Sequence, residues 1–410
     1  MEKDRVILHC DCNGFFASVE TLLEPSLSRY PMVVTGDPES RHGIILAKNE
    51  KAKAYGIQTA ETIWQAKQKC PGLVCVLPHH EEYSRISRLV NAVYLDYTDL
   101  VDPFGIDESF LDVTGSLRLF KKPPKALADH IRERVKQEIG ITVSVGVSFC
   151  RVFAKLGSDY KKPDATTVID RSNYKEIAYP LPVSALLYAG KRTTEILAKM
   201  GILTIGQLAA ADRGQIVARL GEGGDTLWRY ANGLDEEPVR AYGDRPAPKS
   251  VGNGMTFRRD IAGEEEVRAG VMALTDSVAA RLREADLKCT VIQVQIKDPN
   301  FRTVQKQCTL KRATWLRQDL TAHAMELIRA ACGGYGSGIR ALTVTAGGLV
   351  APGDTEEQLD IFSTNGTDTA DRQESVEQAM ASIRQKHGSA SIRLGCYQNA
   401  EIGTDKHKPH

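Results

Sequence analysis

The chain has 410 residues, of which 42% are hydrophobic and 26% are charged, and its 53 basic and 52 acidic residues nearly cancel. This length predicts two to four domains, the apolar content excludes wholesale disorder, and the balanced charge excludes a uniformly basic coat. Nine cysteines without paired metal-ligand spacing indicate reduced thiols in a cytoplasmic protein, not a disulfide framework or a zinc site. No apolar run is long enough to span a membrane, and no signal peptide is expected at the start.

The first part of the chain mixes short apolar strands with amphipathic helices. Strands are expected at 5–10, 31–35, 43–47 and 142–148, and helices at 81–97 and 129–139. This mixture predicts an α/β layer in which helices cover a sheet.

The segment 184–234 has a different pattern, because glycines interrupt its helical runs. Gly190, Gly201 and Gly221 stand between apolar helical stretches. Two helix-glycine-helix units favour paired helix-hairpin-helix motifs, in which backbone amides approach a phosphate closely. A helical bundle with capped ends would give the same pattern.

The remaining chain divides by composition and charge. A run rich in proline and glycine at 242–254 predicts a linker between domains. Residues 241–350 contain 16 basic and 11 acidic side chains, whereas residues 351–410 contain 6 and 10. A basic module therefore precedes an acidic tail.

Three acidic residues stand where apolar segments end. Asp11 follows the first expected strand, and Asp107 and Glu108 interrupt a later apolar stretch. Neighbours on a regular strand point to opposite faces, so a turn or bulge must bring both side chains together. Three carboxylates at strand ends can hold two magnesium ions for phosphoryl transfer. Separately, Asp11 could be a helix N-cap and the pair could be a solvated hairpin tip.

Three segments together carry a family resemblance: D-C-N-G-F-F-A-S-V-E, G-I-D-E-S-F-L-D-V-T and F-A-K-L-G-S-D-Y-K-K-P-D. In this order and spacing they resemble the Y-family DNA polymerases, most of all the bacterial polymerase IV and UmuC-like branch. The resemblance runs from about residue 6 to 362. It implies an α+β multidomain right-hand polymerase with a ferredoxin-like palm, small fingers, a helix-hairpin-helix thumb and an α/β little finger.

The resemblance also implies domain boundaries. The palm is expected at 1–10 and 79–170, with the fingers and the start of a palm helix at 11–78. The thumb is expected at 171–240, a linker at 241–253, the DNA-binding little finger at 254–350, and an acidic tail with a short helix at 351–410.

The implied activity is template-directed DNA synthesis of low fidelity that bypasses damaged template bases, without proofreading. Asp11, Asp107 and Glu108 match the catalytic carboxylates, and with the backbone carbonyl of Cys12 they would hold two Mg²⁺ ions. The substrates would be primer-template DNA and deoxynucleoside triphosphates, and the protein is expected to be a monomer.

Several residues match the family's nucleotide contacts. Phe16 matches a steric gate that excludes a ribose 2′-OH, and Phe15, Asn49, Lys53 and Lys162 are expected near the nucleotide. Without the resemblance, the two phenylalanines would be read as core residues and Lys162 as an exposed loop lysine.

The sequence departs from the family at three positions of this region. Glu50 and Lys53 replace the usual tyrosine and arginine, and Asn13 stands where many relatives have a second aspartate. Lysine keeps the positive charge but lacks the fork geometry of arginine, and a glutamate beside a triphosphate repels it unless it turns away. These changes bear on nucleotide contacts and not on the class of reaction.

DNA contacts are expected from Gly190 and Lys191 in the thumb and from a basic track in the little finger that includes Arg258, Arg259, Lys297 and Lys306. As individual residues, most of these could equally belong to a solvated charged face.

The pentapeptide Gln358, Leu359, Asp360, Ile361 and Phe362 lies in the acidic tail and resembles the bacterial sliding-clamp-binding motif. Its apolar side chains could instead pack onto the protein's own surface. An apolar stripe at Val376, Ala379, Met380 and Ile383 predicts one more helix beyond it.

Two other functions compete with the polymerase. A non-catalytic adaptor on the same fold would recruit repair proteins to DNA, but such proteins lose the metal-binding acids, which are all present here. A nucleotide cyclase with a similar palm would not explain the helix-glycine-helix units, the basic module or the tail.

Overall fold

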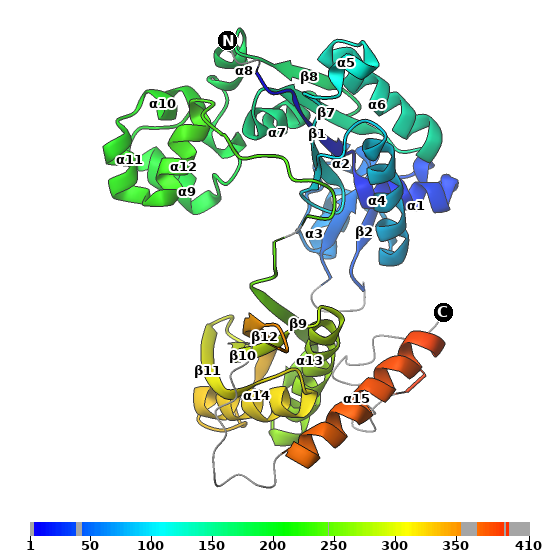
Figure 1. Ribbon diagram of the computed structural model, residues 1–410, viewed down its shortest axis with the longest axis vertical. Helices are drawn as coiled ribbons and strands as arrows, with labels where there is room; N and C mark the ends of the chain where they lie inside the picture. Colours follow the sequence, from blue (N-terminus) through cyan, green and yellow to red (C-terminus); the bar gives the residue numbers. More distant parts are fainter. Residues whose placement is uncertain (1–3, 38–42, 245, 354–366, 389–390, 393–410) are drawn as a thin grey trace. The chain divides into compact units, whose positions relative to one another are not determined.

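The computed structural model describes residues 4–37, 43–244, 246–353, 367–388 and 391–392. The chain divides into two compact units, Met1–Arg245 and Pro246–His410 (Figure 1). Among the described helices, none is both long enough and apolar enough to cross a membrane.

A five-stranded sheet with the order β5-β6-β1-β7-β8 forms the centre of the first unit. Its strands are β1 (Ile7–Cys12), β5 (Val101–Pro103), β6 (Glu108–Asp112), β7 (Val143–Ser148) and β8 (Thr166–Ile169). β1 lies antiparallel to both β6 and β7, and β8 lies parallel to β7. Helices cover both faces, which is why β1 and β7 are buried along their whole length.

The side chains of β1 alternate between two layers. Leu8 and Cys10 join the core under helices α4 (His80–Leu95) and α6 (Pro124–Ile139). His9 and Asp11 face helix α7 (Arg151–Tyr160) on the other side. β1 continues two residues beyond its expected end at residue 10, because its ladder with β6 and β7 continues past that point. Asp11 therefore lies inside the strand and not after it.

Helix α7 meets β7 at a pair of glycines. A Cβ atom on Gly146 would lie 1.8 Å from the carbonyl oxygen of Ala154, and one on Gly157 would lie 3.1 Å from the Cα of Gly146. The two backbones are therefore in direct contact, and this contact sets how closely α7 approaches the sheet.

A smaller sheet with the order β3-β2-β4 stands beside this layer, with short helices around it. Its elements are α1 (Phe15–Leu23), the 3-10 helix η1 (Pro25–Arg29), β2 (Met32–Thr35), β3 (Ile45–Lys48), α2 (Glu50–Ala54), α3 (Ile63–Lys69) and β4 (Val74–Val76). Val33, Ile45 and Ala66 belong to its core. A one-turn helix, α5 (Leu117–Phe120), precedes α6.

The rest of the first unit is helical. It contains α8 (Tyr174–Ala178), the 3-10 helix η2 (Val183–Ala185), α9 (Lys191–Lys199), α10 (Ile205–Ala210), α11 (Arg213–Leu220) and α12 (Glu222–Ala231). The three glycines stand between helices as predicted: Gly190 caps α9, and Gly201 and Gly221 have φ angles of 78° and 62°.

The second unit is a four-stranded antiparallel sheet with helices on one face. Its strands, in the order β11-β10-β12-β9, are β9 (Ser250–Ile261), β10 (Lys288–Lys297), β11 (Thr303–Thr314) and β12 (Ile339–Val350), and its helices are α13 (Glu264–Glu284) and α14 (Arg317–Cys332). Ile292, Val294 and Val344 face the helices. Gln293 and Gln295 alternate with them and lie on the opposite, open face.

The expected linker at 241–253 is too long by four residues. β9 begins at Ser250, because Val251 is buried and pairs with Ala346 of β12.

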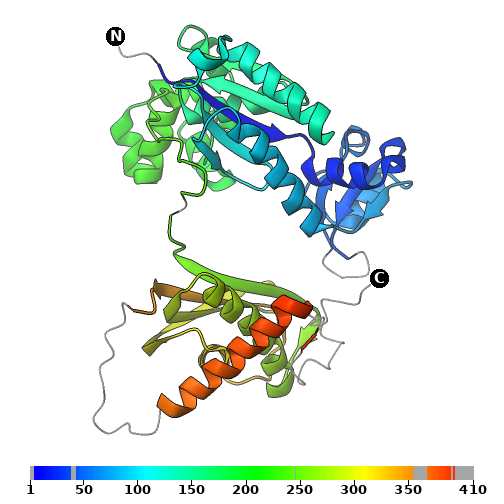
Figure 2. The ribbon, with the colours of Figure 1, turned by 45° about the vertical axis from the view of Figure 1, so that its right-hand side comes forward.

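The helix expected in the tail is α15 (Thr367–His387), which lies against α13 and α14 (Figure 2). Polar groups hold it there. The buried Glu377 pairs with Arg283 at 2.5 Å and accepts a hydrogen bond from the backbone N–H of Arg317, and Arg384 pairs with Asp276 at 2.9 Å. In the apolar stripe, Val376 is 55% exposed, so this stripe is not what attaches the helix.

Candidate active site

The three predicted carboxylates meet where β1 and β6 lie side by side. Asp11 is opposite Glu108 in the ladder, and the N–H of Cys12 donates a hydrogen bond to the carbonyl of Asp107 at 2.9 Å. The N–H groups of Phe104 and Gly105 donate to the carbonyl of Glu108, which forms the turn before β6. This is the turn that the adjacent acids require. It leaves Asp107 just outside the strand, while Glu108 begins it.

Two lysines compensate part of this negative charge. The Nζ of Lys155 lies 3.1 Å from Asp11 and 2.7 Å from Glu108, and the Nζ of Lys162 lies 2.7 Å from both Asp11 and Asp159. Lys155 and Asp159 are one turn apart on α7, and Lys162 follows the end of this helix. The position of α7 therefore decides the charge around Asp11.

A buried histidine completes the cluster. The Nε2 of His9 lies 3.2 Å from Glu108, and its Nδ1 lies 2.8 Å from the hydroxyl of Ser158. Burial lowers the pKa of His9 despite the neighbouring carboxylate. Donor atoms of His9, Asp11 and Glu108 lie within 4.8 Å of one another, which is close enough to share one metal ion.

The two adjacent acids have opposite electrostatic surroundings. Burial, together with repulsion from Asp11 and Glu108, raises the pKa of Asp107 to about 6. Burial alone would also raise the pKa of Glu108, but His9 and Lys155 lower it to about 2. A divalent cation would relieve the repulsion at Asp107, and carboxylate and carbonyl oxygens are the donors that Mg²⁺ prefers. The residues therefore fit a magnesium site.

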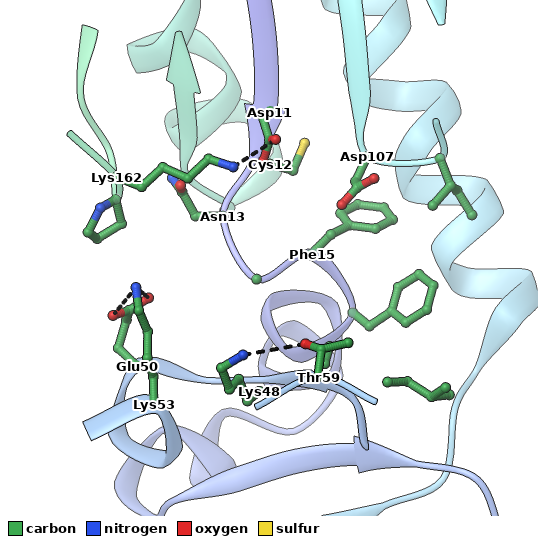
Figure 3. Close-up of a pocket in the computed structure, with 16 residues that line it drawn as sticks. Asp11, Cys12, Asn13, Phe15, Lys48, Glu50, Lys53, Thr59, Asp107 and Lys162 are labelled. Carbon is green, nitrogen blue, oxygen red and sulfur yellow. Dashed lines mark hydrogen bonds and ion pairs between the residues drawn. The ribbon is translucent and has the colours of Figure 1, made fainter. Parts of the chain in front are cut away.

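Asp11 and Asp107 border a cavity of about 390 Å³ (Figure 3). In Figure 3, Asp11 and Asp107 lie on one side of it, and Lys48, Glu50 and Lys53 lie on the other. The cavity is lined by Asp11, Cys12, Asn13, Gly14, Phe15, Phe16, Leu46, Ala47, Lys48, Glu50, Lys53, Thr59, Ile106, Asp107, Lys162 and Pro163. Asp11 and Asp107, with Lys162 beside Asp11, thus face Lys48, Lys53 and Glu50 across a space that Phe15 and Phe16 also border.

Phe15 and Phe16 both reach the cavity but differ in burial. Phe15 is buried in the core beneath the sheet. Phe16 is half-buried and stacks on Tyr83, with ring centroids 4.1 Å apart and an angle of 12° between the planes.

The residues that depart from the family also line the cavity. Glu50 pairs with Lys53 at 3.4 Å, so its charge is partly neutralised and it does not turn away from the cavity. The amide of Asn13 is held by Thr142 at 3.0 Å and by Ser144 at 2.8 Å.

Asn49, expected near the nucleotide, does not line the cavity. Its side-chain oxygen caps α2 through the N–H of Ala52, and its amide nitrogen donates to the carbonyl of Tyr30.

The predicted DNA contacts occupy different surfaces. Gly190 and Lys191 form the start of α9. In the second unit, Lys297 pairs with Thr303 and shares the open face with Gln295, whereas Lys306 pairs with Val294 and lies on the side that the helices cover. Arg258 and Arg259 are neighbours on β9, and Arg259 pairs with Glu266 of α13 at 2.5 Å. The predicted clamp peptide, residues 358–362, lies outside the described ranges.

Sequence reasoning missed Lys155, His9 and Lys48. Lys155, Asp159 and Lys162 stand four and three residues apart, a spacing that aligns side chains on one helix face and could have identified Lys155. Nothing in the pattern around His9 distinguishes it from an ordinary core residue. Lys48 reaches the cavity from β3, and its Nζ lies 3.4 Å from the hydroxyl of Thr59.

Comparison with known proteins identifies the family. Residues 10–159 match the impB/mucB/samB family, and residues 248–361 match its C-terminal domain. A DNA polymerase IV of Acetivibrio thermocellus is 45% identical over 95% of this chain and 97% of its own length. DNA polymerase IV 1 of Bacillus subtilis is 34% identical over 98% of this chain and 96% of its own length.

A solved structure shares the fold. A Y-family DNA polymerase chimera of Dbh and Dpo4 superposes with a TM-score of 0.75 at 20% identity, over 84% of this chain and 99% of the chimera. The α+β right-hand polymerase fold is thereby confirmed. The chain belongs to the impB/mucB/samB family, and thus to the Y-family DNA polymerases.

Proposed function

We propose that the cavity between Asp11, Asp107 and Lys53 is the nucleotidyl-transfer site of this Y-family enzyme. The chain is a DNA-directed DNA polymerase that performs translesion synthesis. The observation that supports the proposal is the arrangement of the cavity. Asp11 of β1 and Asp107, just before β6, lie on one side, Lys48 and Lys53 lie on the other, and Phe15 and Phe16 border the same space.

Within this proposal, Asp11, Asp107, Glu108 and the carbonyl of Cys12 hold two Mg²⁺ ions. Bound magnesium supplies positive charge to the attacking and leaving oxygens of an in-line displacement at the α-phosphate. The β1–β6 ladder holds the three carboxylates in place, and His9 and Lys155 keep Glu108 ionised.

Three lysines serve the triphosphate. Lys53 and Lys162 both line the cavity and are paired with carboxylates. Lys48 contacts the hydroxyl of Thr59, and it forms no ion pair within the described ranges. An entering triphosphate competes with Glu50 for Lys53 and with Asp11 and Asp159 for Lys162, which partly offsets the energy of binding.

Phe16 selects the sugar. Its ring borders the cavity beside the carboxylates, where a ribose 2′-OH would meet a carbon surface. Phe15 forms the buried floor behind it.

DNA is held by both units. The five-stranded sheet with its helices is the palm, β2–β4 with their helices are the fingers, α8–α12 are the thumb, and residues 250–350 are the little finger. The amide end of α9 at Gly190 and Lys191 contacts backbone phosphates. In the little finger we assign phosphate contact to the open face with Lys297; Lys306 is exposed too, but it lies on edge strand β11 and points to the side of the sheet on which the helices pack.

The tail peptide 358–362 attaches the enzyme to the sliding clamp. This part of the proposal rests on the sequence motif and its position between β12 and α15. We further propose that the enzyme acts as a monomer in the cytoplasm.

Primer extension with magnesium tests the central proposal. The wild type should extend primers on undamaged and damaged templates, and the double variant Asp107→Ala, Glu108→Ala should not. DNA affinity should stay nearly unchanged in the same variant, since the acids repel phosphate and do not bind it. Extension by the double variant within tenfold of wild type would remove these acids from the mechanism, whereas a wild type that extends no primer would favour the adaptor alternative.

A further inference from the structure

We propose that Glu20 is a positioning residue for sugar selection and acts through Tyr83, which holds the ring of Phe16 in place. This inference rests on the proposed role of Phe16 as the steric gate. Neither Glu20 nor Tyr83 lines the cavity, so they act on the nucleotide through a neighbour that does; Tyr83 stacks on Phe16 at 4.1 Å and meets the buried Phe15 at 6.3 Å.

Two helices bring these side chains together. Phe16 and Glu20 are four residues apart on α1 and therefore share one face of that helix. His79, at the N-cap of α4, and Tyr83, four residues later, face them from α4. The contact between α1 and α4 thus contains an aromatic pair at one end and a carboxylate with its donors at the other.

Tyr83 joins the two ends. Its ring stacks on Phe16 with a centroid separation of 4.1 Å, and its hydroxyl donates a hydrogen bond to Glu20. The side chain of Tyr83 is fully buried, so the ring has no room to move away from Phe16 unless its hydroxyl bond breaks. His80 contacts both rings edge-on, at 6.0 Å from Phe16 and 5.6 Å from Tyr83.

Glu20 is only 2% exposed, which is unusual for a carboxylate. Its oxygens contact three donors: the Tyr83 hydroxyl, the backbone N–H of His79 at 3.3 Å, and the Nδ1 of His79 at 3.0 Å. A buried carboxylate is tolerated only when its hydrogen bonds are satisfied, so the Tyr83 hydroxyl is held strongly.

A steric gate discriminates only as far as its position is fixed. A 2′-OH adds about one heavy atom, and a ring that can retreat by that amount will accept it. Tyr83 blocks this retreat on the face of Phe16 that points away from the cavity, and Glu20 holds Tyr83. Loosening either residue should therefore raise ribonucleotide incorporation more than it changes deoxynucleotide incorporation.

The test measures kcat/KM for deoxynucleotides and ribonucleotides with the full chain and takes their ratio. Tyr83→Phe keeps the ring and removes the hydroxyl, and Glu20→Leu removes the acceptor. In both, the ratio should fall by about tenfold, which corresponds to about 1.4 kcal/mol between the two barriers. Glu20→Gln retains a carbonyl acceptor for Tyr83 and should restore most of the discrimination.

Tyr97→Phe is the matched control. Tyr97 is also a buried tyrosine of this core. Its hydroxyl accepts a hydrogen bond from Arg134 at 3.2 Å, and its ring packs against Phe120 and His130. Its loss should lower thermal stability and leave the ratio unchanged. Thermal unfolding of every variant identifies any variant that fails to fold. If Glu20→Leu fails to fold, the ratio measured for Tyr83→Phe decides whether the positioning role is correct.

Phe16→Ala separates the inference from the function on which it rests. If Phe16→Ala lowers the ratio and Tyr83→Phe does not, the gate stands and the positioning role is wrong. If Phe16→Ala leaves the ratio unchanged, both the gate and the positioning role are wrong. A ratio that falls in Tyr83→Phe and Glu20→Leu but not in Glu20→Gln or Tyr97→Phe supports the inference.

Discussion

At the scale of single residues, the adjacent acids Asp107 and Glu108 divide two tasks between them. Glu108 contacts Lys155 and His9, and these groups stabilise its charge in the free enzyme. Asp107 makes no ion pair in the described part of the chain, and burial with repulsion raises its pKa. Asp107 is therefore the acid whose charge most needs a bound cation, and it destabilises the metal-free fold.

This difference leads to a prediction for Asp107→Asn. Removing the uncompensated charge should stabilise the protein in the presence of a chelator. The free energy of unfolding should rise by an amount on the order of 1 kcal/mol, and the unfolding temperature should rise with it. The same change should slow primer extension by about 10³ or more, equal to about 4 kcal/mol of barrier. Thermal melts in chelator and single-turnover extension measure the two effects.

The matched control is Asp164→Asn. Asp164 pairs with Arg132 at 2.6 Å and Lys136 at 3.1 Å, and although burial opposes it, these partners lower the pKa of this carboxyl. Its loss should lower the unfolding temperature, with little effect on extension. If Asp107→Asn were destabilising in chelator, the proposed repulsion would be wrong.

At the scale of elements, strands and helices were predicted where side-chain periodicity carries the signal. The strands expected at 31–35 and 142–148 and the glycines at the ends of helices α9 to α12 are local features, and the structure confirms them. The sequence alone could not show that Lys297 and Lys306 lie on opposite faces of the sheet. This depends on the register in which β10 pairs with β11, which no local pattern determines. The three acids were found through motif spacing, whereas Lys155 reaches Asp11 only because α7 packs over β1.

The attachment of α15 is a further feature that composition could not predict, and the buried Glu377–Arg283 pair contributes to it together with the Arg384–Asp276 pair. Glu377→Ala would leave Arg283 without its partner and the N–H of Arg317 without its acceptor. We expect the attachment of α15 to weaken by about 2 kcal/mol or more, although the Arg384–Asp276 pair remains. Hydrogen exchange of residues 372–387 should then become fast. Glu374→Ala, in the same helix but in contact with Gln378 only at 3.5 Å, should leave exchange as in the wild type.

At the scale of the whole molecule, the total charge is nearly neutral, but the two units have different roles. The first unit contains the cavity, and the second unit has a core of its own and an open polar sheet face. A DNA polymerase with this division should lose affinity, and not chemistry, when the second unit is altered.

The lysines on opposite sides of the second sheet provide the test. Lys297→Gln should weaken primer-template binding and reduce the slope of log affinity against log salt by about 1. Lys306→Gln removes the same charge from the helix-covered side and should change neither. Binding titrations at several salt concentrations measure both, and an equal loss in the two variants would contradict the assignment to the open face.

The clamp peptide should act on the whole enzyme without touching its chemistry. Leu359→Ala with Phe362→Ala should leave extension by the enzyme alone unchanged and abolish its stimulation by the clamp. Burying two or three apolar side chains supports roughly micromolar attachment, which increases local concentration and still permits exchange. Full stimulation of the double variant would mean that the peptide has no role at the clamp.

The contact between Gly146 and Gly157 makes the active site sensitive to substitution at positions that carry no functional group. Most core positions tolerate graded changes, because neighbouring side chains adjust by small amounts. Here the neighbour is backbone, so even a methyl group at residue 146 must push α7 outward, and Lys155 moves away from Asp11 with it. A substitution at this glycine therefore has no small, graded version. The position of Lys155 beside Asp11 thus requires glycine at residue 146, a position with no functional group.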